Sequence, residues 1–269
     1  MSEASSPAQE TPAILRQRLR AGVGRGPTTG LAQGHLQGNI VILPERLSGD
    51  FARYCLLNPK PCPVIGVSEP GDPSIPALAE DLDIRTDLGG YRLFRDGRPS
   101  GRLDDLGEVW RDDLVTFVLG CSFSFEAALI RSGIAVRHIA AGRNVPMYVT
   151  DIPTRAAGPF AGPMVVSMRG FAPADAIRAV LISDTFRLAH GAPVHLGDPA
   201  AIGIADIDRP DFGDPPVLEP GDVPLFWACG VTPQMAIRTA APDLAITHDP
   251  GHMLITDLFA EAAETFIPT

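Results

Sequence analysis

The stretch Phe117–Leu129 ("FVLGCSFSFEAAL") places residues capable of chemistry at a change of secondary structure. An apolar run ends at Gly120, Cys121 follows, and a helix-like pattern then begins with Glu126 in its first turn. A helix N-terminus lowers the pKa of a nearby thiol, so Cys121 could act as a nucleophile that forms an acyl-thioester. Cys121 could equally be a small side chain that packs where a strand becomes a helix.

A second stretch, Val223–Ile237 ("VPLFWACGVTPQMAI"), repeats this order of a buried run, a cysteine and a helix start. The first amides of each helix are unpaired and carry partial positive charge, which suits a carboxylate or a developing oxyanion. Ser122 or Ser124 is the expected cap of the first helix, and Thr232 that of the second. Because open α/β sheets bind ligands beyond their strand ends, the two junctions could border one anion-binding cleft.

Other polar residues could complete such a site. Glu126 could transfer protons, or its charge could simply complement the helix dipole. Arg143 and Asn144 could bind a carboxylate, with the arginine as a bidentate fork, or could order the proline-bearing loop that follows them. His248 and His252 are candidates for a second proton carrier, and we expect one of the two to be a structural hydrogen-bonding residue.

The remaining features are interpreted as structural. His138 lies within an apolar stretch, and Cys229 is expected to serve packing. His248 and His252 are four residues apart, but the intervening Pro-Gly pair excludes the helical geometry of a zinc-binding H-E-x-x-H motif, so no metal site is predicted. The glycine-rich segment Gly22–Asn39 lacks the Gly-Lys-Ser/Thr ending of a phosphate-binding loop and predicts an irregular loop around a pocket.

Composition limits the class of partner. The 269-residue chain is 45% hydrophobic and carries 32 acidic against 22 basic side chains, a net charge of −10. This charge would repel phosphate backbones and anionic headgroups, so neither nucleic acid nor a membrane is expected as a partner. The N-terminus lacks a signal-peptide core and no apolar stretch approaches a bilayer span, which predicts a cytoplasmic protein. Four scattered cysteines without a C-x-x-C pair indicate free thiols.

The elements that position these residues alternate between strands and helices. Residues 1–12 are expected to form a disordered tail, and residues 13–269 one compact catalytic unit. The continuous apolar run Leu114–Gly120 indicates a strand buried on both faces, in a parallel or mixed sheet covered by helices. The patterns predict helices over 12–20, 45–57, 124–133 and 172–191, a hairpin over 91–100, and strands over 39–44, 64–67, 114–120, 134–139, 164–171, 223–228, 244–247 and 253–256.

Several longer motifs resemble a known family. They read, in groups along the chain, "GPTTGLAQGHLQGN", "NPKPCPV", "GCSFSFE", "RNVPMY", "HGAPVHLGDP", "GIADIDRPDFGD", "VPLFWACGVTPQ" and "ITHDPGHMLITD". Together they resemble the hydro-lyase family that is grouped with D-glutamate cyclase. The resemblance implies an α/β fold, in which a mixed-sheet three-layer sandwich is interlocked with a smaller two-layer α/β subdomain. It also implies carbon–oxygen lyase chemistry, the named activity being dehydration of D-glutamate to 5-oxo-D-proline.

Cyclising dehydration defines what the site must supply. A neutral amine has to attack the distal carboxyl carbon and the leaving oxygen has to be protonated, which requires a base, an acid and contacts for the carboxylates. We therefore expect a lyase for a small carboxylate substrate that needs no cofactor. Two alternatives stay open: a non-catalytic protein that binds a small carboxylate, and a hydro-lyase for a different hydroxy acid. The sequence also leaves a homo-oligomer open.

Overall fold

The computed structural model describes residues 10–260. The tail predicted over residues 1–12 therefore lies, for residues 1–9, outside the described residues. At its other end, Thr11 caps helix α1 (Pro12–Arg20), because its hydroxyl accepts the N–H of Ile14 at 3.4 Å. This helix has the bounds predicted from the sequence.

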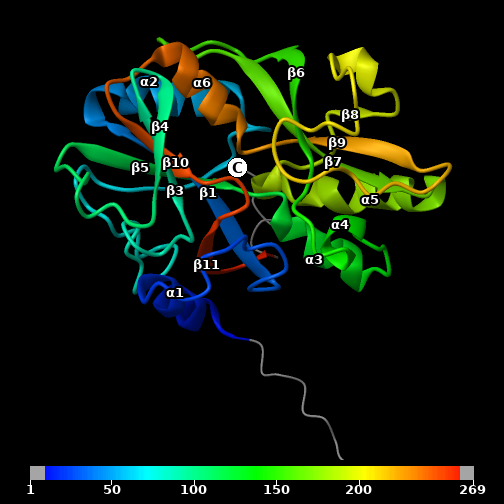
Figure 1. Cartoon of the computed structure of the whole chain (residues 1–269), viewed down its shortest axis with the longest axis horizontal. Coiled ribbons are helices and arrows are strands. Elements are labelled where there is room, and N and C mark those ends of the chain that lie inside the picture. The colour runs from blue at the N-terminus through cyan, green and yellow to red at the C-terminus, as the bar shows by residue number, and fades with distance from the viewer. Residues whose placement is uncertain (1–9, 261–269) are drawn as a thin grey trace, which may run out of the picture.

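Two antiparallel sheets lie side by side (Figure 1). The larger has the strand order β2-β5-β1-β10-β3-β4, with β11 pairing the first half of β1, and the smaller has the order β6-β7-β9-β8. The strands are β1 (His35–Pro44), β2 (Val64–Val67), β3 (Tyr91–Arg95), β4 (Arg98–Leu103), β5 (Leu114–Gly120), β6 (Met147–Pro153), β7 (Pro163–Phe171), β8 (His195–Leu196), β9 (Val223–Ala228), β10 (Ala245–His248) and β11 (Leu254–Phe259).

The α/β class is confirmed, but the mixed pairing expected for the larger sheet is wrong. Every strand pair among the described residues is antiparallel. Strands β5 and β10 run in the same direction, but β1 lies between them and runs opposite to both. Their carboxyl ends therefore meet at one edge of the sheet, as they would in a parallel sheet.

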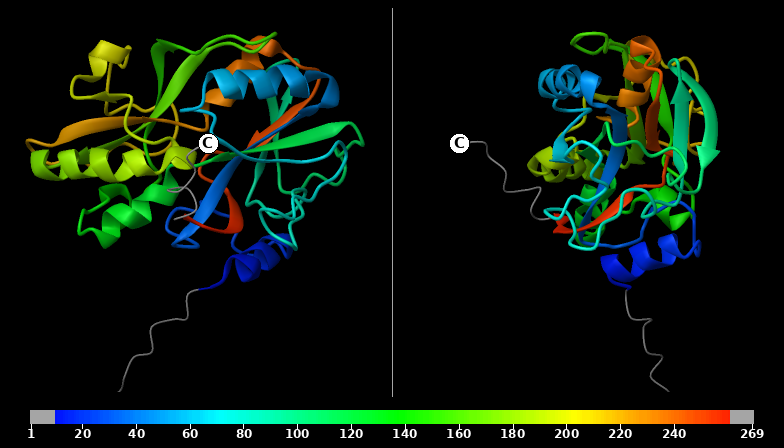
Figure 2. Two further views of the ribbon diagram at one scale, coloured as in Figure 1. Left: turned by 180° about the vertical axis from the view of Figure 1, so that it is seen from behind. Right: turned by 90° about the vertical axis from the view of Figure 1, so that its left-hand side faces the viewer.

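The helices cover the two sheets in an interlocked way (Figure 2). Helix α3 (Phe123–Arg131) follows β5 of the larger sheet, yet its Phe125 ring packs 5.3 Å from Trp227 of β9 in the smaller sheet. Helix α6 (Thr232–Ala240) follows β9, yet its Ile237 joins the cluster of Phe117 from β5. Each sheet is thus partly covered by a helix that directly follows a strand of the other sheet.

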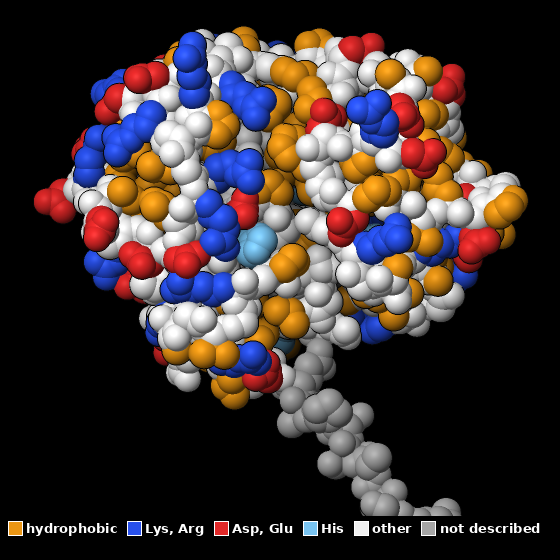
Figure 3. Space-filling view, in the orientation of Figure 1, with side chains coloured by type: hydrophobic (Ala, Val, Ile, Leu, Met, Phe, Trp, Pro, Cys, Tyr) orange, Lys and Arg blue, Asp and Glu red, His pale blue; other side chains and the backbone are white. Residues whose placement is uncertain are grey.

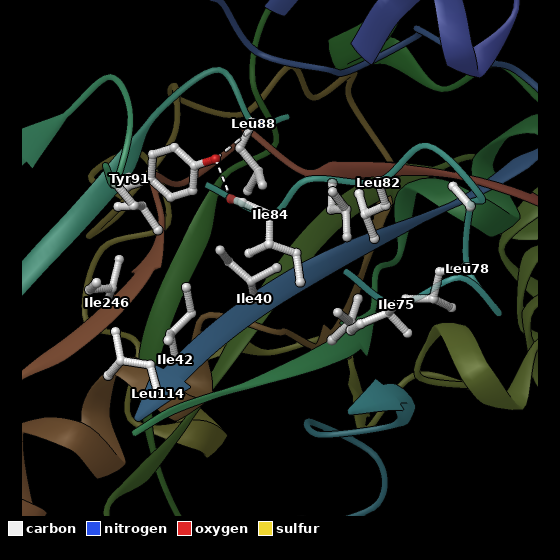
Figure 4. Packing of buried hydrophobic residues seen from close by; sticks show 14 of the residues in the cluster. Ile40, Ile42, Ile75, Leu78, Leu82, Ile84, Leu88, Tyr91, Leu114 and Ile246 are labelled. Atoms are coloured by element: carbon white, nitrogen blue, oxygen red, sulfur yellow. Dashed lines mark hydrogen bonds between the residues drawn. The ribbon is translucent and has the colours of Figure 1, made fainter. Parts of the chain in front are cut away.

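An irregular segment, in place of a helix, covers one face of the larger sheet. Ile40, Ile42 and Ile246 are fully buried on this face, against residues from the segment between β2 and β3. Tyr91 fixes that segment, because its hydroxyl donates to the carbonyl of Ile84 at 2.6 Å (Figure 4). The opposite face of the sheet packs against α2 (Glu45–Leu57).

One prediction about the elements on the smaller sheet is wrong. The strand predicted over 134–139 is the short helix α4 (Arg137–Ala140), because Gly133 in the left-handed region (φ 76°) ends α3 and redirects the chain. In α5 (Pro173–Thr185), the apolar side chains of Ile177 and Leu181 are 65% and 67% exposed. Small residues of α5 face inward, since α3 packs closely beside it.

None of the helices among residues 10–260 combines the length and the apolar character that crossing a bilayer requires. Cysteines Cys55, Cys62, Cys121 and Cys229 are all free and buried, as expected.

Replacement of Gly120 tests the close contact between the end of β5 and the backbone of residues 187–189. A Cβ on Gly120 would lie 1.6 Å from the carbonyl oxygen of Leu188 in the 3-10 turn η1 (Arg187–Ala189), so backbone has to move. We expect Gly120→Ala to lower the free energy of unfolding by about 3 kcal/mol in urea denaturation. Gly101→Ala, where nothing lies within 4 Å, is the matched control and should stay within about 0.5 kcal/mol of wild type. Equal stabilities of the two variants would contradict this packing.

Candidate active site at the junction of the two sheets

The two cysteine-bearing junctions lie next to each other. The Asn39 side-chain amide of β1 donates to the carbonyl of Gly120 at 2.9 Å, at the end of β5. A Cβ on Gly230 would lie only 2.0 Å from the same Asn39 nitrogen, so the turn after β9 packs directly on this amide. Cys121 and Cys229 share one apolar cluster. The repeated pattern in the sequence therefore corresponds to two neighbouring turns with Asn39 between them.

The thiols at these turns are not activated. Burial raises the pKa of Cys121 to about 12 and that of Cys229 to about 11. The N–H groups of Phe123 and Val231 act in the opposite direction, but more weakly. This contradicts the lowered pKa expected for Cys121 at a helix N-terminus. Because the thiolate is the reactive form, burial disfavours a nucleophilic role for either cysteine at neutral pH.

The hydroxyl groups expected to cap the helices instead form hydrogen bonds with neighbouring strands. Neither α3 nor α6 has a side-chain cap hydrogen bond. The Ser122 hydroxyl accepts a hydrogen bond from Arg169 at 3.0 Å, and Ser124 accepts the backbone N–H of Gln37 at 3.3 Å. Thr232 bonds the backbone of β7 in both directions, at 3.0 and 3.2 Å. These contacts fix the helix starts against neighbouring strands.

A buried ion pair occupies the centre of the junction. Arg169 of β7 is 4% exposed, and its Nε and Nη2 donate to Glu126 Oε1 at 2.9 and 2.6 Å. Its Nη1 donates to Ser167 at 2.9 Å. The guanidinium carbon also lies 5.2 Å from the ring centroid of Phe125 and 5.3 Å from that of Trp227, within cation–π range. We call Arg169, Glu126 and their hydrogen-bond partners the Arg169 centre.

The Arg169 centre keeps Glu126 ionised. Burial by itself would raise the pKa of this carboxyl, but the charges of Arg169 and His138 outweigh burial and hold the pKa below its usual value. His138, which we had interpreted as structural, places Nε2 3.2 Å from Glu126 Oε1. At neutral pH Glu126 can therefore accept a proton but carries none to donate.

Arg169 was missed in the sequence, although a signal was present. It stands two residues after Ser167 in an otherwise apolar strand, so both side chains point to the same face. A charged side chain inside a buried strand requires a buried partner. The pattern thus indicated an ion pair, but gave no indication that its partner was Glu126, 43 residues earlier.

His190 was also missed. It is 1% exposed and has a left-handed backbone (φ 78°), which is uncommon outside glycine. Its Nδ1 lies 2.6 Å from the carbonyl oxygen of Lys60; since a carbonyl only accepts, Nδ1 carries the proton. Nε2 then keeps its lone pair and has no partner among the described residues. Burial, reinforced by the positive charge of Arg169, lowers the pKa of His190 to about 4, so the ring is neutral.

The two histidines predicted near the C-terminus differ in environment. His248 is fully buried, its Nδ1 lies 3.3 Å from the backbone nitrogen of Ile40, and burial lowers its pKa to about 4. It fits the structural role expected for one of the pair. His252 is partly exposed on the loop between β10 and β11, with Nδ1 3.1 Å from the carbonyl of Pro250. Within residues 10–260, no hydrogen bond or ion pair joins either ring to Glu126.

Arg143 and Asn144 lie in the loop between α4 and β6. Arg143 is exposed and donates to the carbonyl of Pro215 at 3.4 Å. The Asn144 side-chain oxygen accepts the N–H of Val145 at 2.9 Å, and its amide nitrogen lies against Gly251. The structure therefore brings Asn144 to the His252 loop and leaves Arg143 away from the Arg169 centre.

A cavity reaches Glu126 from the loop that precedes β1. Residues 30–35 of the glycine-rich segment form one wall, and α3 forms the other. Its polar lining includes Gln37, Ser124 and Glu126. A second hollow reaches His138 and Arg169 from the opposite side. The loop around a pocket predicted from the glycine pattern is thus present.

Arginines gather beside the seam between the two halves (Figure 3). Arg92 and Arg102 both donate to the carboxylate of Asp249, directly after β10, at 2.6 and 3.2 Å. Both guanidinium groups are partly exposed. A local concentration of positive charge on an acidic chain favours the approach of small anions. The part of the chain that the structure describes contains no group of three or more potential metal ligands.

Comparison with known proteins identifies related chains. A family model described as D-glutamate cyclase matches residues 115–257. A Bordetella petrii protein named "Putative hydro-lyase" is 58% identical over 90% of this chain and 93% of its own length. Proteins of the same name from Verminephrobacter eiseniae and Methylobacterium radiotolerans are 59% and 58% identical, each over 90% of this chain and over 89% and 90% of their own lengths.

The buried neutral histidines predict an acid-sensitive fold. Unfolded histidine takes up a proton near pH 6.5, whereas folded His190 and His248 do so only near pH 4. The two rings therefore do not reduce the free energy of unfolding above pH 6.5. As the pH falls towards 4, each ring lowers it by up to about 3 kcal/mol. His190→Asn keeps an N–H donor and tolerates the left-handed backbone. In urea denaturation from pH 7.5 to 4.5, stability of this variant should fall less steeply; an unchanged slope would contradict the assignment.

Proposed function

Because the chain belongs to the D-glutamate cyclase family, we propose that it is a carbon–oxygen lyase that acts on a small acidic substrate in the cavity beside Glu126. Its reaction is the dehydration of D-glutamate to 5-oxo-D-proline. The observation that carries this proposal is that Glu126 lines a cavity and that Arg169 keeps its carboxyl group ionised. A lone buried carboxyl would instead become neutral.

The proton balance of the reaction suits an ionised carboxylate. In the cyclisation a bond forms between the amine nitrogen and the distal carboxyl carbon, and one oxygen of that carboxyl leaves as water. The substrate ammonium supplies both protons of the water. The site therefore only relays protons, and a carboxylate that is ionised before and after turnover can do this. In our proposal Glu126 accepts the first proton from the ammonium and passes it to the leaving oxygen.

Neighbouring groups support the same assignment. His138, at 3.2 Å from Glu126, is a candidate for the second relay, and neutral His190 offers an unpaired nitrogen near Arg169. Ser124 lines the cavity and accepts one hydrogen bond, from the backbone N–H of Gln37, so its oxygen can still accept a second one from the substrate ammonium. Cys121 has no chemical step in this scheme, because burial keeps its thiol protonated.

The proposal is tested by turnover of purified protein. D-Glutamate should be converted to 5-oxo-D-proline, as measured by proton NMR with chiral chromatography. Glu126→Gln should lower kcat at least 100-fold, the order of magnitude expected when a proton-transfer group is lost. Cys121→Ser, a change of similar size at the same junction, should leave kcat within about threefold of wild type.

Three other outcomes would each reject part of the scheme. Loss of activity in Cys121→Ser with retained activity in Glu126→Gln, both variants being folded by circular dichroism, would make the thiol the reactive group. Turnover of a hydroxy acid but not of D-glutamate would support the lyase activity and would contradict D-glutamate as its substrate. Thermal stabilisation by small carboxylates without any turnover would favour a binding protein.

A further inference from the structure

Two residues that line the cavity beside Glu126 each have a buried polar atom without a hydrogen-bond partner among the described residues. Gln37, on β1, is 3% exposed, and its Oε1 makes no hydrogen bond with any described residue. The same holds for Nδ1 of His35, two residues earlier on the same strand. Both residues line the cavity. An unpaired buried polar atom costs about 1–3 kcal/mol, so each of these two atoms requires a hydrogen-bond partner that the described residues do not supply.

The orientation of the Gln37 amide is fixed by its other half. Its Nε2 donates to the carbonyl of Leu31 at 2.9 Å and to that of Thr28 at 3.3 Å. Both partners are carbonyl oxygens, so the group that faces them has to be the NH₂, and its two protons are both used. The atom left over is therefore an oxygen, which can only accept a hydrogen bond.

The groups around this oxygen favour a cation that donates hydrogen bonds. Ser124 accepts the backbone N–H of Gln37, which places its hydroxyl beside the same strand. Glu126 lines the same cavity, and its carboxyl group is ionised. The positive charge of Arg169 lies behind Glu126, and four hydrogen bonds to Glu126, Ser122 and Ser167 engage its guanidinium. The cavity wall thus presents acceptors and negative charge.

We propose that Gln37 Oε1, with Ser124 and Glu126, forms a subsite for a primary ammonium group. This inference rests on the proposed function in locating the substrate in the same cavity, and it adds the residue that recognises the amine. An ammonium carries three N–H donors and a positive charge, whereas a hydroxyl offers one donor and no charge. The subsite therefore selects an amino acid over the corresponding hydroxy acid or unsubstituted diacid.

The test measures selectivity for the amine by isothermal titration calorimetry. Two ligand pairs differ only in this group: D-glutamate with glutarate, and D-aspartate with succinate. D-Aspartate would have to close a four-membered lactam, so this pair reports binding without the proposed reaction. We expect wild type to bind the amine-bearing member of each pair at least about tenfold more tightly, the effect of a hydrogen bond to a charged group.

Two glutamine variants separate recognition from structure. In Gln37→Met, which keeps the length of the side chain, the tenfold preference should fall to about onefold, while the Kd of succinate changes little. Gln33→Met is the matched control, because Gln33 lines the same cavity but is exposed. It should keep the preference. A purely structural effect of Gln37→Met would weaken both members of a pair equally and leave their ratio unchanged, which would overturn the inference.

The remaining outcomes distinguish this inference from the proposed function. Equal binding of D-aspartate and succinate by wild type would overturn the ammonium subsite, even if D-glutamate is turned over. A clear preference for the amine that depends on Gln37, without turnover of any acidic amino acid, would support the subsite and reject the lyase. If Gln37→Met fails to fold, the wild-type protein still provides a test. Binding of D-malate to wild type as tightly as D-aspartate would overturn the inference.

Discussion

The buried ion pair between Arg169 and Glu126 is the constraint on which the junction depends. Removing two charges from water costs several kcal/mol for each ion, and only close pairing with further hydrogen bonds offsets that cost. Here Arg169 comes from the smaller sheet, and Glu126 comes from the helix that the larger sheet leads into. The pair can form only when α3 lies against β7. The charge requirement therefore fixes how the two halves meet.

The same burial produces opposite protonation states in neighbouring groups. Glu126 stays charged because Arg169 neutralises it, whereas Cys121 and His190 stay neutral because they have no opposite charge in contact. The charged pair thus lies near two titratable side chains, Cys121 and His190, that stay uncharged. In such an environment a ligand's own charge interacts strongly with the few ionised groups, since little water screens them. This is why the acceptors on the cavity wall matter for selectivity.

The sequence predicted the elements well and their relations less well. Apolar runs and turn residues located most strands and helices, because these signals are local. In α5 the small residues Ala176 and Ala179 are buried, whereas the larger Ile177 is exposed. Periodicity records which residues are apolar, but not which neighbour allows close approach. The residues of the proposed site follow the same rule. Glu126 was a candidate because of its place in a helix, whereas no local pattern encodes the contacts that Arg169 and Gln37 make.

The strand order has a consequence for how the chain reaches this fold. Strand β10 lies between β1 and β3, and β11 completes the other half of the same edge, although both follow β1 by about 200 residues. Until β10 and β11 have been synthesised and have paired with β1, one edge of β1 has exposed, unpaired backbone groups. Contacts of such long sequence separation slow folding, because the intervening chain has to be closed first. The larger sheet can therefore assemble only after the chain has been synthesised beyond β11, and truncation before Ala245 would leave β1 paired along one edge only.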